Sequence, residues 1–92
     1  MKHFDLGPKY LTPGVVASIR ESPIFCREVN HALERHEESD FGDMSTEDIF
    51  ANLSAVARGD RVFSAYDTSK GRLWIITEAD RSHTTILFPS EY

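Results

Sequence analysis

The change in hydrophobic period near residue 60 constrains the fold of this chain more than any other feature. Before it, apolar residues recur at helical spacing, as Phe25, Val29 and Leu33 do at i, i+4 and i+8. After it come three segments rich in β-branched and aromatic residues, at 61–67, 72–78 and 83–88. Consecutive strands with short links form an antiparallel meander. The sequence therefore predicts an α+β fold, with N-terminal helices packed on one face of a small sheet.

Three helices are expected in the first half of the chain. Thr12 and Ser22, each followed by proline, are N-cap signals for helices over 12–22 and 23–38. Ser45, with an acid three residues later, resembles a capping box for a third helix, which stops at Gly59. This third helix is expected to turn four apolar residues toward the core: Ile49, Phe50, Leu53 and Val56.

The N-terminal segment is a candidate for a fourth strand, because Phe4 and Leu6 alternate with polar residues. Pro8 has no N–H to donate, so a strand here should be short or lie on an edge. The length of 92 residues predicts one domain, residues 1–92, with one thin core.

Composition predicts a cytoplasmic globular protein. No apolar run approaches the length of a membrane span, and the start, MKHFDLGPKY, lacks the apolar region of a signal peptide. The lone Cys26 cannot form an internal disulfide, which fits a reducing compartment. On its apolar helical face it is expected to be a small core residue and not a nucleophile.

The formal net charge of −5 argues against a generic nucleic-acid binder, because such proteins usually carry a basic surplus. Seven carboxylates lie between residues 34 and 48 against one arginine. The plain interpretation is a solvated helix end. The functional interpretation is an acidic loop that docks on a basic groove, with Phe41 as an anchor between Asp40 and Asp43.

The polar link at 79–82, between the last two predicted strands, has the length of an ordinary hairpin turn. If helices cover one face of the sheet, the other face exposes alternate residues. These would be Ser64, Tyr66, His83 and Thr85, with either Trp74 or Thr77; the register of Trp74 stays open. Together with Arg81 they would form a recognition patch, because aromatic residues and arginine are typical interface anchors. The predicted partner-binding residues are Asp40, Phe41, Asp43, Tyr66, Asp80, Arg81 and His83.

An enzyme is the alternative. Small metal-independent RNases of the barnase, EndoU and RelE type also place helices before a sheet, and they need a base, an acid and a cation. His36 (or His83), Arg61 and Tyr66 are the candidates here. No metal site or cofactor is expected, because the chain has no HExxH, CxxC or glycine-rich phosphate loop.

Four stretches resemble a family of short proteins carried on bacterial plasmids, prophages and phages. They are LTPGVVASI (11–19), HEESDFGDMSTED (36–48), RVFSAY (61–66) and LWIITEADRSHTTILFPSEY (73–92). The relatives tend to have tryptophan where this chain has Phe41. The resemblance implies a mobile-element protein with a role in counter-defence. It suggests a non-enzymatic phage anti-CRISPR inhibitor that binds a type I surveillance complex in the host cytoplasm. A homodimerisation module is a third hypothesis.

Overall fold

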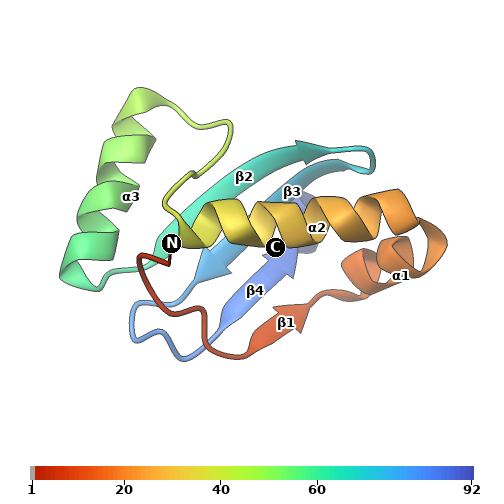
Figure 1. Cartoon of the computed structure of the whole chain (residues 1–92), viewed down its shortest axis with the longest axis horizontal. Coiled ribbons are helices and arrows are strands. Elements are labelled where there is room, and N and C mark those ends of the chain that lie inside the picture. The colour runs from red at the N-terminus through yellow and green to blue at the C-terminus, as the bar shows by residue number, and fades with distance from the viewer. Residues whose placement is uncertain (1) are drawn as a thin grey trace.

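The computed structural model describes residues 2–92 and has the predicted α+β architecture (Figure 1). The order of elements along the chain is β1 (Lys9–Leu11), α1 (Pro13–Glu21), α2 (Pro23–Glu37), α3 (Thr46–Arg58), β2 (Val62–Thr68), β3 (Gly71–Thr77), β4 (Thr84–Leu87) and a short 3₁₀ helix, η1 (Pro89–Glu91).

The sheet has the strand order β1-β4-β3-β2. The strands β2, β3 and β4 form the predicted antiparallel meander, and β1 pairs with β4 in parallel. The N-terminal strand is therefore confirmed as short and on an edge, but it begins at Lys9, after Pro8, and not at Phe4. The carbonyl of Pro8 accepts a hydrogen bond from Thr84 N–H over 2.9 Å. Proline has no N–H, so this carbonyl is the one backbone group that it can offer to the neighbouring strand.

Local chemistry explains the ends of the helices. The hydroxyl of Ser22 accepts from the N–H of Phe25 at the start of α2, and Ser45 accepts from the N–H of Asp48 at the start of α3. Gly59 ends α3 in the left-handed conformation, with φ of 76°. The predicted caps at Ser22, Ser45 and Gly59 are confirmed.

The start of α1 is capped from the other end of the chain. Thr12 makes no side-chain cap bond to its own helix. Its hydroxyl donates to Glu91 Oε1 over 2.6 Å, and Glu91 Oε2 accepts the Gly14 N–H over 2.8 Å. These bonds keep the pKa of the Glu91 carboxyl below its usual value. The side-chain carboxylate of Glu91 thus takes the capping role that the sequence assigned to Thr12.

The main core lies between the sheet and the pair α1 and α2, which run across one face of it (Figure 1). Its buried apolar members are Val15, Phe25, Val29, Ala32, Leu73, Ile75 and Ile86. A second core of Phe41, Ala55 and Val62 lies between α3 and the β2 end of the sheet.

The edge of β2 is closed by side-chain and loop contacts. The amide of Asn52 in α3 donates to Phe63 O over 2.6 Å and accepts from Phe63 N–H over 3.1 Å. Further along the edge, Ala65 N–H donates to Phe41 O and Ala65 O accepts from Asp43 N–H. These bonds satisfy backbone groups that would otherwise offer a template for another strand.

Candidate functional site

A polar centre built around His36 lies inside the domain. His36 comes from α2 and is fully buried; its Nδ1 lies 2.5 Å from Ser64 Oγ, and its Nε2 lies 2.9 Å from Thr77 Oγ1. Thr77 Oγ1 lies 2.7 Å from Thr84 Oγ1, and the Thr84 hydroxyl donates to Leu6 O over 2.6 Å. The centre thereby joins α2, β2, β3, β4 and the N-terminal segment.

The hydrogen bonds of this centre fix where its protons lie. Because Thr84 donates to the carbonyl of Leu6, Thr84 Oγ1 accepts from Thr77. The Thr77 proton is then used, so Thr77 accepts from His36 Nε2–H. Burial, together with the nearby positive charge of Arg81, lowers the pKa of His36 from 6.5 to about 3, so the ring is neutral. Its Nδ1 then carries no proton and accepts from the Ser64 hydroxyl.

The structure does not bring the predicted RNase residues His36, Arg61 and Tyr66 together. His36 is closed off from solvent, and Tyr66 is also buried, with its hydroxyl donating to Asp40 O over 2.6 Å. Burial raises the pKa of Tyr66 well above its usual value. Arg61 lies on the surface, near Tyr92 Oη at 3.4 Å and Glu78 at 3.7 Å. These residues do not form an open catalytic site.

The residues predicted to share one recognition face lie on both faces of the sheet. Ser64 and Tyr66 were expected to face water, but both are buried beneath the helices. Trp74 lies on the opposite face, half-buried, with ring centroids 5.0 Å from Phe63 and 5.6 Å from Tyr92. Ser64 faces the helices because its hydroxyl forms a hydrogen bond with the buried His36, and this contact determines which face of β2 points inward.

The hairpin residues mostly support the fold. Arg81 donates to Asp60 O over 2.6 Å and to Glu78 O over 3.2 Å, and its guanidinium lies 5.3 Å from the ring centroid of Phe4. It thus joins the hairpin to the end of α3 and to the N-terminal segment.

The other two predicted hairpin contacts are also engaged locally. The side chain of Asp80 accepts from Ser82 N–H over 3.0 Å, and the contacts with Ser82 hold the pKa of this carboxyl below its usual value. The ring of His83 lies 5.5 Å from the ring of Tyr10.

The prediction that Phe41 is an exposed anchor is wrong. Only 2% of Phe41 is exposed, because the bonds of its loop to Ala65 hold the backbone along β2 and turn the ring into the second core. Its predicted neighbours are on the surface. Asp40 makes a two-bond pair with Arg35, at 2.8 and 3.1 Å, and Asp43 lies 3.2 Å from Arg72.

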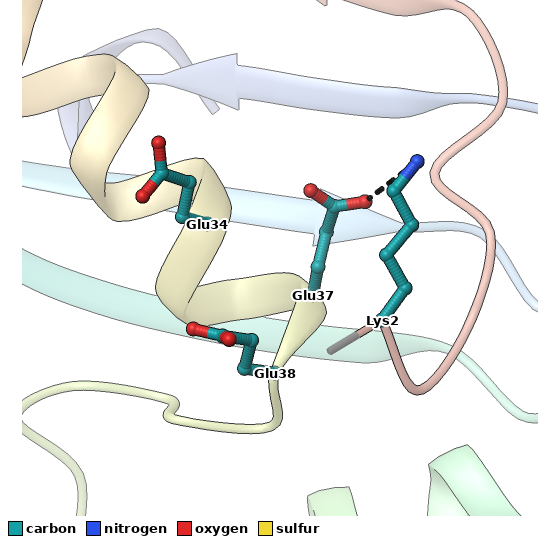
Figure 2. A pocket seen from close by; sticks show the side chains of 4 residues that line it. All are labelled: Lys2, Glu34, Glu37 and Glu38. Atoms are coloured by element: carbon teal, nitrogen blue, oxygen red, sulfur yellow. Dashed lines mark ion pairs between the residues drawn. The ribbon is translucent and has the colours of Figure 1, made fainter.

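The carboxylates at the C-terminal end of α2 border a surface hollow of about 200 Å³. Figure 2 shows Glu34 and Glu37 on the helix, Glu38 directly after it, and Lys2 from the N-terminal segment beside them. Lys2 Nζ lies 3.7 Å from Glu37 Oε2. These three glutamates belong, with Asp40, Asp43, Glu47 and Asp48, to one segment of the chain (residues 34–48), whose carboxylates we call the acidic end.

The sequence prediction missed the exposed side of α3. Phe50 and Leu53, expected in the core, are 67% and 44% exposed, whereas the polar Asn52 is buried. The pattern is ambiguous because apolar residues occur on both sides of this helix. Thr46, Phe50, Leu53 and Ala57 are four, three and four residues apart, which places them on one line of the helix. This spacing is the signal in the sequence that indicates a second side.

Comparisons with protein-family models, with curated proteins and with solved structures find no match to this chain. Within residues 2–92, no helix is both long and apolar enough to cross a membrane. The same residues contain no group of three or more histidine, cysteine, aspartate or glutamate side chains placed to hold a metal ion.

Proposed function

We propose that this protein is a non-enzymatic inhibitor of the anti-CRISPR type, which binds a nucleic-acid-handling surface of a type I surveillance complex. The observation that carries the proposal is the acidic end. It gathers carboxylates from α2, from the following loop and from the first turn of α3.

The charge of the acidic end is only partly neutralised. Lys2, Arg35 and Arg72 pair with Glu37, Asp40 and Asp43. Three further carboxylates, on Glu34, Glu47 and Asp48, have no ion-pair partner among the described residues. Such a surface attracts a basic partner and raises the rate of association with it.

A surface that handles nucleic acid is rich in lysine and arginine, because its affinity comes largely from neutralising phosphates. Carboxylates at the ends of two helices can pair with the same lysines and arginines and so compete with the phosphates. Engagement of His36 and Tyr66 inside the fold supports binding over acid–base catalysis. The choice of a surveillance complex as the target rests on the resemblance to proteins of mobile elements.

The test is whether the protein prevents a purified type I surveillance complex from binding its target DNA, followed by gel shift. The acidic variant Glu34→Gln, Asp43→Asn, Asp48→Asn removes three charges from the acidic end. The control variant Asp5→Asn, Glu21→Gln, Asp67→Asn removes three charges elsewhere. We expect the acidic variant to lose inhibition at least tenfold and the control to keep it within about twofold. Equal losses in the two variants, or no inhibition by the wild type, would overturn the proposal.

A further inference from the structure

The outer side of α3 carries an exposed apolar stripe that no other described element covers. Its apolar members are Phe50, Leu53 and Ala57, the polar Thr46 lies on the same line at the start of the helix, and all four residues are exposed. Their spacing of four, three and four residues places them along one line of the helix. Figure 1 shows α3 standing to one side of the sheet and of the α1–α2 layer. Because its four residues are exposed, this line is accessible to another molecule.

The orientation of α3 about its axis is fixed. On its inner side Asn52 holds both backbone groups of Phe63, and Ala55 is buried in the second core. Turning Phe50 and Leu53 inward would break both of these hydrogen bonds and expose Ala55. The exposure of the stripe is therefore a property of the native fold.

Charged residues at the two ends of α3 suggest what covers the stripe. Glu47 and Arg58 are eleven residues apart, close to three full turns, so they lie on one line that flanks the stripe. Between them this line carries the small residues Ala51 and Ser54. The flank is thus acidic at its N-terminal end and basic at its C-terminal end, and it carries only small side chains in the middle.

We propose that α3 pairs with α3 of a second copy of this chain, in antiparallel orientation about a two-fold axis. Phe50 and Leu53 stand on either side of the middle of the helix, so the axis brings Phe50 of each copy against Leu53 of the other. The same axis places Glu47 of each copy opposite Arg58 of the other. A parallel pair would instead place the Glu47–Arg58 lines of the two copies on opposite sides of the contact, where they do not pair.

The charges are available for this contact. Arg58 lies 3.3 Å from Asp60, but both side chains are more than half exposed, and exposed pairs of this kind contribute little. Glu47 has no ion-pair partner among residues 2–92. Because a helix of 13 residues is only about 20 Å long, the contact is small and the dimer dissociates readily.

Sedimentation equilibrium on the full chain tests the dimer at about 0.15 M salt, where charges are screened beyond about 8 Å. The wild type should pass from monomer to dimer over concentrations on the order of 10 μM to 1 mM, as expected of a small interface. Leu53→Glu should stay monomeric with an unchanged circular dichroism spectrum. The control Ile24→Glu, at a residue that is 58% exposed on α2, should dimerise like the wild type.

A charge-swap cycle tests the antiparallel register. Glu47→Arg and Arg58→Glu each create two like-charge contacts and should weaken the dimer about fivefold or more, whereas the double variant restores both pairs and should return within about twofold. A monomeric wild type would overturn the proposal, as would equal loss in Leu53→Glu and Ile24→Glu. A double variant no tighter than the single ones would refute the antiparallel pairing. None of these variants is used in the inhibition test, so the two proposals fail independently.

Discussion

Replacing His36 with glutamine tests the buried polar centre through the pH dependence of stability. The folded pKa of His36 is about 3, and the usual value for an unfolded chain is about 6.5. Between these values the unfolded chain binds one more proton than the folded protein. The free energy of unfolding therefore falls as the pH is lowered, by about 1.4 kcal/mol per pH unit. The contribution is complete above about pH 6.5 and is lost toward pH 3.

Between pH 7.5 and pH 5.0 this single group should lower the free energy of unfolding by about 2 kcal/mol. The window is chosen because Asp40, Asp80 and Glu91 also have lowered pKa values and lose stability in the same direction. Their unfolded pKa values lie near 4, so their effect falls mostly below pH 5.

The assay is urea unfolding at pH 7.5, 6.0 and 5.0. His36→Gln should be less stable at every pH, but its free energy of unfolding should change by less than about 0.5 kcal/mol across the window, since it lacks the titrating group. The control His31→Gln, at an exposed histidine of the same helix, should keep the wild-type slope. Equal slopes for wild type and His36→Gln, or an NMR titration of the His36 ring near pH 6.5, would refute the neutral buried imidazole.

Three further substitutions test the packing by the same urea assay. Asn52→Ala should cost about 2–3 kcal/mol, because it leaves both backbone groups of Phe63 without partners; a cost below about 0.5 kcal/mol would contradict this closure of the β2 edge. Glu91→Ala should cost about 1 kcal/mol by uncapping α1, and unchanged stability would exclude that role. Phe41→Ala should cost about 3–5 kcal/mol, whereas an exposed anchor would lose binding at unchanged stability.

The helices and the meander were predictable because their signals are local. Ser22, Ser45 and Gly59 act within one turn of their own positions, and the alternation after residue 60 needs no knowledge of the rest of the chain. The role of Glu91 was not predictable in this way. Its carboxylate reaches Gly14 across 77 positions, and no spacing in the sequence encodes that contact.

The face that each strand turns inward was not fixed by its own residues. In β2 both alternating sets contain apolar and small residues, so VFSAYD fits either register. The choice depends on His36, which offers a hydrogen-bond partner to Ser64 from 28 positions away. This contact also explains why Tyr66 and His36, attractive as catalytic residues in the sequence, belong to the interior.

The same ambiguity affected α3. Ile49 and Val56 suggest one inward face and Phe50 and Leu53 another, and the apolar count does not distinguish them. The polar residue Asn52 decides the question, because it binds the open edge of β2. A rule that sends apolar residues inward therefore places Ile49 and Val56 correctly but Phe50 and Leu53 on the wrong side.

The proposed function is binding to a host protein complex. The most direct measurement is a pull-down of the tagged full chain from a lysate of a host with a type I system, with and without nuclease, read by mass spectrometry. We expect recovery of the subunits of the surveillance complex in both conditions. Recovery of RNA alone, or loss of those subunits on nuclease treatment, would contradict a protein-directed inhibitor.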